Sequence, residues 1–294
     1  MKRDLASILA AAALLLAACA PAATPALTAV PPSAAAQPVD LTVFAAASLT
    51  DAYAEIKTNF EAAHPGVTVI YNFGGSNALA QQLGEGAPAD VFASANSRQM
   101  EVAVESGRVA PESAQVFVRN RLVVITPADS TADVATLRDL ANPGLKLILA
   151  ARDVPVGQYS LDFLDKAAAD ASFGAVFKDA VLANVVSYED NVRSVLTKVA
   201  LGEGDAGIVY TSDIVGDPAK DVVSLEIPDA LNTIATYPIA PVVDSARAEL
   251  ARAFIDYVLS AEGQAILENY GFLPAGGGSQ VSHPAASLSE SGWR

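Results

Sequence analysis

Short apolar runs alternate with helix-like segments along most of this chain, from residue 40 to residue 273. The run 41–46, for example, is rich in β-formers, and Tyr53, Ile56 and Phe60 then recur at helical spacing. Alternation of this kind predicts an α/β fold in which helices cover both faces of parallel sheet. In such sheets, ligands bind beyond the carboxyl ends of the strands, where the chain turns into the next helix. Those turns are therefore where a functional site is expected.

The same two periodicities predict the other elements of the body. Further strands are expected at 67–73, 90–94, 122–126, 145–150, 184–187, 206–210 and 222–226. Helices are expected near 79–83, 97–105, 158–170, 191–201, 245–259 and 261–269. The chain shows no internal repeat, so a solenoid or propeller is not indicated.

The N-terminus has the pattern of a targeting segment. A short basic start precedes the apolar stretch 5–16, which is too short to span a bilayer as a helix. Residues 16–19, Leu-Ala-Ala-Cys, resemble the cleavage box of bacterial lipoproteins, in which the cysteine becomes the first mature residue and carries the lipid. We therefore expect a signal peptide at 1–18 and a lipid on Cys19, with a plain secretory signal as the alternative. Cys19 is the chain's single cysteine, so it forms no intramolecular disulfide.

The two flanks and the overall charge restrict what the body can bind. Residues 19–38 are rich in Ala and Pro and predict a stiff, unstructured tether. Residues 275–294 carry Gly and Ser without apolar periodicity and predict a disordered tail. The chain has 18 basic and 33 acidic residues, a net charge of -15. Such a charge repels nucleic acid and anionic lipid, so neither is an expected partner.

Residue types that catalysis requires are scarce. The two histidines are His64, in a helix-terminating turn, and His283, in the expected tail, so we expect neither a histidine base nor a His-based metal site. The sequence contains no His-Glu-x-x-His, no Gly-x-Ser-x-Gly and no phosphate-binding Gly-Lys-Ser/Thr loop. Residues 202–207 match Gly-x-Gly-x-x-Gly, but they follow a helix and precede a strand, the reverse of the dinucleotide-binding order. We predict no enzyme, no cofactor and no direct ligands for a metal cation.

Four turns before expected helices share one property: each presents backbone N–H groups that have no partner within the helix. They are 45–51, 73–79, 154–157 and 187–193, and Ser48 and Ser76 add hydroxyls to the first two. A helix N-terminus carries about half a positive charge, so these turns suit an anion without any Lys or Arg. Taken singly, each is explained by an N-cap or a tight turn. Together, on successive strand–helix units, they favour a cradle for an anion.

Three motifs resemble the molybdate-binding proteins of bacterial ABC importers. They are Val-Phe-Ala-Ala-Ala-Ser-Leu-Thr-Asp-Ala at 43–52, Gly-Ala-Pro-Ala-Asp-Val-Phe-Ala-Ser at 86–94, and Gly-Ile-Val-Tyr-Thr-Ser-Asp at 207–213. The similarity extends over about residues 39 to 274. It implies the two-lobed type II periplasmic-binding-protein fold, with a ligand cleft between lobes joined by two crossing segments. By analogy, lobe one would be 39–120 plus 237–274, and lobe two would be 121–236.

The resemblance also implies which groups hold the ligand. Ser48 and Ser76 would donate hydroxyls and nearby N–H groups from lobe one, Val156 and Val192 would donate backbone N–H groups from lobe two, and Tyr210 would donate its phenol hydroxyl. Two arginines lie close to these positions in sequence, Arg152 and Arg193. We expect both to be surface or interlobe partners rather than ligands.

The function implied is that of an extracytoplasmic lipoprotein, a monomer held to the membrane by its lipid. It would capture molybdate or tungstate and pass it to the membrane permease of an ABC importer. A pocket made of donors alone suits a fully deprotonated oxyanion, because a protonated one presents an O–H without an acceptor, at a cost of about 1–3 kcal/mol. The alternatives are a protein that binds sulfate, phosphate or a small organic anion, a surface hydrolase with a serine nucleophile, and a structural lipoprotein without a ligand.

Overall fold

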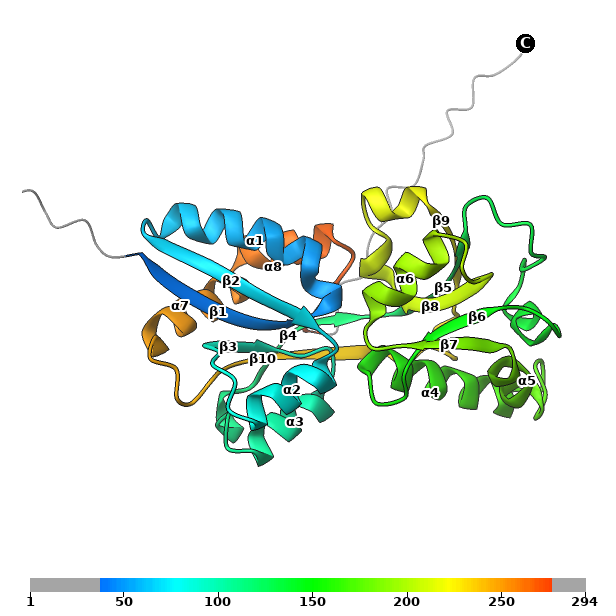
Figure 1. Ribbon diagram of the computed structural model, residues 1–294, viewed down its shortest axis with the longest axis horizontal. Helices are drawn as coiled ribbons and strands as arrows, with labels where there is room; N and C mark the ends of the chain where they lie inside the picture. Colours follow the sequence, from blue (N-terminus) through cyan, green and yellow to red (C-terminus); the bar gives the residue numbers. More distant parts are fainter. Residues whose placement is uncertain (1–37, 277–294) are drawn as a thin grey trace, which may run out of the picture. The chain divides into compact units, whose positions relative to one another are not determined.

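The computed structural model describes residues 38–276, which fall in one compact unit. The expected signal peptide at 1–18, the lipidation site Cys19 and almost all of the expected tether and tail lie outside the described residues. The described part contains two sheets flanked by helices (Figure 1). One sheet has six strands in the order β11-β4-β10-β3-β1-β2, and the other has five in the order β7-β6-β8-β5-β9.

The six-stranded sheet and its helices form what we term the first lobe. Its strands are β1 (Val39–Ala46), β2 (Val67–Gly74), β3 (Val91–Ala93), β4 (Gln115–Asn120), β10 (Ala235–Pro241) and β11 (Leu273–Pro274). The helices packed on it are α1 (Thr50–Ala63), α2 (Ser76–Gly84), α3 (Ser97–Glu105), α7 (Ala248–Leu259) and α8 (Ala261–Asn269). A short 3-10 helix, η1 (Ala47–Leu49), joins β1 to α1.

The five-stranded sheet and its helices form the second lobe. Its strands are β5 (Leu122–Pro127), β6 (Leu147–Ala150), β7 (Val185–Glu189), β8 (Ala206–Tyr210) and β9 (Val222–Glu226). Its helices are α4 (Pro155–Ala169), α5 (Phe177–Ala183) and α6 (Val192–Ala200), and the 3-10 helix η4 (Thr211–Ile214) follows β8. The chain enters this sheet between Asn120 and Leu122 and leaves it between Glu226 and Ala235.

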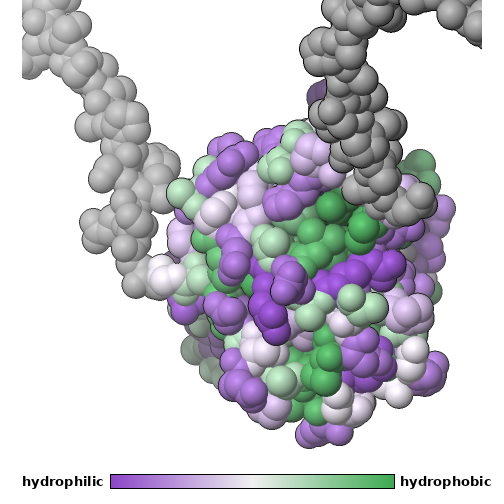
Figure 2. Space-filling model, turned by 90° about the vertical axis from the view of Figure 1, so that its left-hand side faces the viewer, coloured by the Kyte–Doolittle hydropathy of each residue, from purple (hydrophilic) through white to green (hydrophobic). Residues whose placement is uncertain are grey.

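Burial follows the sequence patterns from which the elements were predicted. Every residue of β5 and β8 is buried, as expected for strands covered on both faces. Helix α6 buries Val192, Val195 and Val199, which recur at three- and four-residue intervals along one face. On the face of the molecule shown in Figure 2, hydrophilic residues interleave with smaller apolar areas. Within residues 38–276, no helix is both long enough and apolar enough to cross a membrane.

The parallel pairing expected from the alternation accounts for only part of each sheet. β1 pairs in parallel with β2 and β3, but β10 runs antiparallel to both β3 and β4, and β5 runs antiparallel to both β8 and β9. Strand β10 was not predicted at all, because it contains Pro238, and a proline normally argues against a central strand. The sheet accommodates this proline with a shift of register against β4 between Tyr237 and Pro238. Strand β4 and helix α5 were also missed.

Candidate anion-binding site

A small cavity lies where turns from both lobes meet. It is lined by all five residues that the sequence singled out, Ser48, Ser76, Val156, Val192 and Tyr210. They come from the turns after β1, β2, β6 and β7 and from the end of β8. The volume of the cavity is about 10 Å³, close to the least that one water molecule needs.

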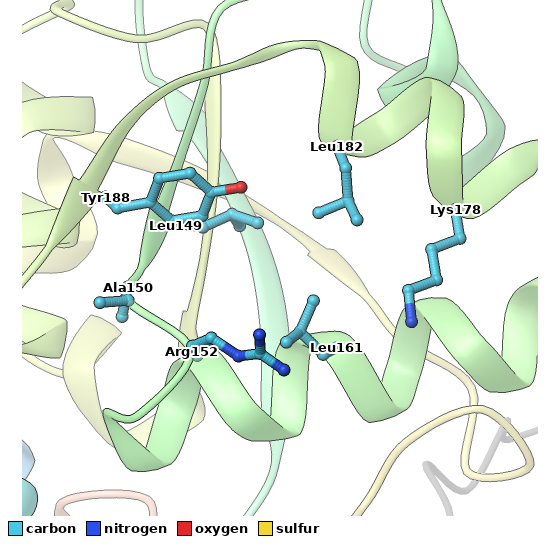
Figure 3. A pocket seen from close by; sticks show the side chains of 9 residues that line it. Leu149, Ala150, Arg152, Leu161, Lys178, Leu182 and Tyr188 are labelled. Carbon is cyan, nitrogen blue, oxygen red and sulfur yellow. The ribbon is translucent and has the colours of Figure 1, made fainter.

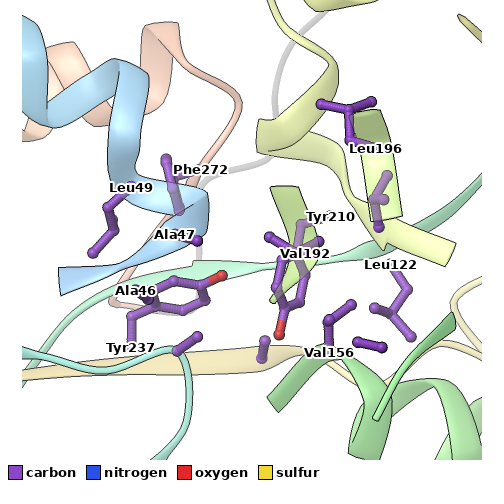
Figure 4. Close-up of a cluster of buried hydrophobic side chains, with 14 of the residues drawn as sticks. Ala46, Ala47, Leu49, Leu122, Val156, Val192, Leu196, Tyr210, Tyr237 and Phe272 are labelled. Carbon is purple, nitrogen blue, oxygen red and sulfur yellow. The ribbon is translucent and has the colours of Figure 1, made fainter. Parts of the chain in front are cut away.

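The lining of this cavity contains no Lys, Arg, Asp or Glu. Its other lining residues are Ala46, Ala47, Gly74, Gly75, Ala95, Val154, Pro155 and Asn191. Figure 4 shows the adjoining cluster of buried hydrophobic side chains, which includes the lining residues Ala46, Ala47, Val156, Val192 and Tyr210. An environment of this kind strengthens hydrogen bonds made within it and makes an unpartnered polar group costly.

Three helices begin at the cavity, and the first amides of each have no acceptor within the helix. Helix α2 begins at Ser76 after the N-cap Gly75. Helix α4 begins at Pro155, which has no N–H, so the amide of Val156 is the first that α4 can present. In α6, the side chain of the N-cap Asn191 accepts the N–H of Ser194 at 3.0 Å, so the amide of Val192 remains free of that cap.

The three hydroxyls at the cavity differ in their hydrogen-bond partners within the protein. The Ser48 Oγ lies 2.9 Å from the Tyr237 hydroxyl, and the Ser76 Oγ accepts the backbone N–H of Ala95 at 2.9 Å. The Tyr210 hydroxyl is buried and has no hydrogen-bond partner among residues 38–276. Burial raises the pKa of Tyr210, so its phenol keeps its proton and can donate.

Ser48 and Asp51 have the spacing of a capping box, but no capping box forms. Ser48 lies inside η1, helix α1 begins at Thr50, and its N-cap Leu49 makes no side-chain capping bond. The Ser48 hydroxyl instead meets Tyr237, and the Asp51 carboxylate lies 2.5 Å from the Arg193 guanidinium. Both side chains thus turn away from local capping and toward the cleft.

Arg193 is an interlobe partner, as expected. Its Nη2 lies 2.5 Å from Asp51 in the first lobe, and its Nε lies 3.2 Å from Asp213 in the second. Asp213 is fully buried, and its second carboxylate oxygen accepts the N–H of Tyr210 at 3.0 Å. Burial raises the pKa of Asp213 to about 6, although the charge of Arg193 acts in the opposite direction.

Direct contacts between the lobes close the cleft around the cavity. The Asn77 amide donates to Asp153 at 2.8 Å, and the Gln99 amide donates to the Asp153 carbonyl at 3.3 Å. Gly75 lies so close to Asp190 that a Cβ added to it would be 2.3 Å from the Asp190 carbonyl oxygen. Because glycine has no Cβ, Gly75 allows the backbones of the two lobes to approach this closely.

A second and larger cavity, of about 440 Å³, lies within the second lobe (Figure 3). It is lined mainly by apolar side chains such as Leu149, Leu161 and Leu182, with Arg152 at its wall. It contains none of the predicted hydroxyls, and the structure therefore separates Arg152 from the small cavity. Among the described residues, no group of three His, Cys, Asp or Glu side chains could hold a metal ion.

Sequence reasoning missed the residues behind the lining. Tyr237 and Asn120 lie on β10 and β4, the strands that were not predicted. Both are fully buried, and they connect to each other and to Ser48 by hydrogen bonds. The sequence offered no signal for them, because the burial of Asn120 and its hydrogen bond to Tyr237 become visible only when β4 and β10 are paired.

The class of protein follows from the fold and from a family comparison. The chain matches the model of the bacterial extracellular solute-binding protein family over residues 41–273, which is nearly all of the described body. The protein therefore belongs to the bacterial extracellular solute-binding proteins and acts outside the cytoplasm. The two-lobed binding-protein fold expected from the sequence is confirmed.

Particular relatives narrow this class. The molybdate-binding protein ModA of Mycobacterium tuberculosis is 36% identical over 79% of this chain and 84% of its own length. The putative ABC transporter substrate-binding lipoprotein YvgL of Bacillus subtilis is 32% identical over 80% of this chain and 86% of its own length. The solved substrate binding domain of a putative molybdenum ABC transporter from Clostridium difficile is 30% identical, with a TM-score of 0.59, covering 80% of this chain and 99% of that one. The resemblance noted in the sequence is thereby confirmed.

Proposed function

We propose that this protein captures molybdate or tungstate outside the cytoplasm and delivers it to the membrane permease of an ABC importer. The observation that carries the proposal is the small cavity lined by uncharged donors and by no charged side chain. The Tyr210 hydroxyl supports it, because a buried hydroxyl without a partner is costly unless a ligand completes it. The relatives described above, named for molybdate or molybdenum, indicate which oxyanion to test first.

In this proposal the five residues are hydrogen-bond donors. Ser48, Ser76 and Tyr210 donate hydroxyls, and the amides of Val156 and Val192 point from helix starts. A micromolar ligand requires about 8 kcal/mol of favourable binding free energy. Five hydrogen bonds to a charged ligand, at about 1.5–3 kcal/mol each, supply this after the entropic cost of binding is met.

Uncharged donors also explain how a protein of net charge -15 can hold a dianion. The positive ends of helices α2, α4 and α6 meet at the cavity, and each attracts negative charge locally. No side-chain cation lines the cavity, so binding the anion there avoids the large cost of burying an ammonium or guanidinium against it.

The donors come from both lobes, so a ligand meets all of them only when the lobes are together. We propose the lobe division 39–120 plus 237–274 and 121–236, with the closed, loaded form docking on the permease. The protein would act as a monomer without catalytic activity. Size exclusion with light scattering tests the monomer, and a mass other than that of one chain would contradict it.

We also propose that the mature chain begins at Cys19, which carries a lipid, and that residues 19–38 tether the body to the membrane. The 32% identity to a protein described as a putative substrate-binding lipoprotein supports this. Mass spectrometry of the protein extracted from membranes is expected to find the lipid on Cys19. A mature chain that begins elsewhere, or that lacks the lipid, would contradict the proposal.

The ligand is tested by thermal unfolding in the presence of single oxyanions. Molybdate and tungstate are expected to raise the melting temperature strongly, because a ligand at about 100 times its dissociation constant adds about 2.7 kcal/mol to stability. Sulfate, which is smaller, and phosphate, which is protonated, are expected to raise it much less at the same concentration. A larger shift with either of them than with molybdate would refute the assignment.

The donor assignment is tested by Ser48→Ala and Ser76→Ala. Each removes one hydroxyl from the cavity, and each is expected to weaken molybdate binding by about 1 kcal/mol or more in calorimetry. Ser106→Ala is the matched control, because its hydroxyl bonds only to the Ala103 carbonyl at the end of α3. Unchanged affinity in both cavity variants, with the control also unchanged, would exclude these serines from the site.

A further inference from the structure

We infer that Asn120 and Tyr237, neither of which lines the cavity, fix the direction in which the Ser48 hydroxyl donates. They thereby act as positioning residues that select a fully deprotonated oxyanion over a protonated one of similar size. This inference deepens the proposed function and rests on its placement of the anion at Ser48. Both residues are fully buried, so solvent does not supply alternative partners.

The orientation of the Asn120 amide is set by the backbone. Its Oδ1 accepts the N–H of Arg121 at 2.9 Å, and a backbone N–H can only donate. The Thr211 hydroxyl donates to the same oxygen at 3.1 Å. The Nδ2 therefore lies on the opposite side, where it donates to Ser212 at 2.8 Å and to the Tyr237 hydroxyl at 3.3 Å.

That orientation decides the next bond. An amide nitrogen has protons but no acceptor capacity, so the Tyr237 oxygen must be the acceptor from Asn120. The phenol has one proton, and its other partner is the Ser48 Oγ at 2.9 Å. Burial raises the pKa of Tyr237 well above its ordinary value, so this proton stays on the phenol. Tyr237 thus donates to Ser48.

Ser48 consequently accepts from the protein and has its own proton left. Among residues 38–276 that proton has no acceptor, and Ser48 lines the cavity. The Ser76 hydroxyl is likewise left with its own proton to donate, because its Oγ accepts the N–H of Ala95 directly at 2.9 Å. Both serines are therefore donors toward the cavity. Tyr210 is the one cavity hydroxyl whose direction no protein group fixes in the described part of the chain.

The consequence is selection by protonation. Sulfate, molybdate and tungstate offer only acceptor oxygens at neutral pH, whereas phosphate and arsenate keep at least one proton. At Ser48 or Ser76 their O–H group would meet a fixed proton and remain unpaired, and at Tyr210 it could be accepted only if the phenol gave up its own hydrogen bond to the ligand, so a bond is lost in either case. Sulfate and phosphate have nearly the same size, so the ratio of their affinities reports protonation alone.

The decisive variant is Asn120→Asp, which reverses the chain of bonds. Both oxygens of a carboxylate accept hydrogen bonds. The Tyr237 hydroxyl therefore donates its hydrogen bond to the new side chain and must accept one from Ser48. Ser48 then presents a lone pair to the cavity. We expect the ratio of phosphate to sulfate dissociation constants, measured by calorimetry at mildly alkaline pH where both are dianions, to fall about tenfold or more.

Tyr237→Phe is the second variant, and it breaks the relay without adding a charge. The Ser48 hydroxyl can then turn either way, so the same ratio should fall, but by less than in Asn120→Asp. Two controls should leave the ratio unchanged. Ser212→Ala removes a partner of Asn120 that does not lead to Ser48, and Asn232→Asp places the same change at another buried amide, which bonds to Leu122.

The outcomes separate this inference from the proposed function. Failure of the wild-type protein to bind molybdate would contradict the proposed function and leave the sulfate-to-phosphate comparison interpretable. A wild-type protein that bound phosphate as tightly as sulfate would overturn the relay. An unchanged ratio in Tyr237→Phe, or in both relay variants, would overturn it as well, even if molybdate binds tightly.

Discussion

Gly75→Ala is expected to weaken molybdate binding by about 10- to 100-fold while the unliganded protein remains folded. The Cβ of the alanine would lie 2.3 Å from the Asp190 carbonyl oxygen and 2.7 Å from the Asn77 Oδ1. Gly75 belongs to the first lobe and Asp190 to the second, so the clash opposes the approach of the lobes. The backbone of Gly75, at φ -63° and ψ 131°, is ordinary for alanine, so the substitution introduces no backbone strain, and the Asn77 side chain can move to relieve its own contact.

The expected loss of molybdate affinity corresponds to the cost of overpacking, which is typically about 1–3 kcal/mol. Calorimetry with molybdate measures the loss, and thermal unfolding without ligand measures the stability of the fold. Gly84→Ala is a matched control at the other end of α2 and outside the cavity lining, because its Cβ would be 3.4 Å from the nearest atom, on Ser106, an ordinary contact. Equal losses of affinity in both variants would show that closure does not depend on the Gly75–Asp190 contact.

The fold could be predicted to a large extent because most elements have clear periodicity. Strands β8 and β9 and helix α8 have the bounds expected from their apolar patterns. The antiparallel strands β4 and β10 could not be predicted from periodicity in the same way. Strand β10 contains Pro238, and its place in the sheet depends on a register shift against β4 that no local pattern encodes.

The candidate site could likewise be predicted only in part. Four of its five predicted members could be found because they lie in turns before helices, and the family resemblance marked those turns and added Tyr210. The groups behind the lining could not, because their roles depend on pairing between distant segments. Ser48 and Tyr237 are 189 residues apart, and Arg193 and Asp51 are 142 residues apart. Sequence proximity suggested a local cap for Asp51, whereas the folded chain provides an arginine from the other lobe.

Arg193→Gln is expected to lower the free energy of unfolding by about 1–2 kcal/mol at neutral pH, which is about the cost of protonating a carboxyl whose pKa is about 6. The reason is Asp213, which is fully buried and whose paired cation is Arg193 at 3.2 Å. Without the guanidinium, the carboxylate would be a buried charge without compensation. The contact of Arg193 with Asp51 contributes little to this loss, because that carboxylate is 36% exposed and water screens the pair.

Asp51→Asn is therefore the control for the interlobe contact, and it should change stability by less than about 1 kcal/mol. Asp213→Asn, combined with Arg193→Gln, should recover much of the loss. The new amide can still accept the Tyr210 N–H through its oxygen, and it carries no charge that needs a partner. A double variant as unstable as Arg193→Gln alone would contradict this account.

The loss of stability in Arg193→Gln should depend on pH, because it arises from the titratable carboxyl of Asp213. The pKa of Asp213 in the folded protein, about 6, lies above its ordinary value, so its protonated form is favoured by folding. Its contribution to stability is fully present below about pH 4 and is lost as the pH rises through about 6. Removing Arg193 raises this pKa further, because the charge of Arg193 lowers it in the wild type. Urea unfolding should therefore show Arg193→Gln destabilised much more at about pH 8 than at about pH 5. Equal destabilisation at both values would mean that Asp213 is not the group that Arg193 compensates.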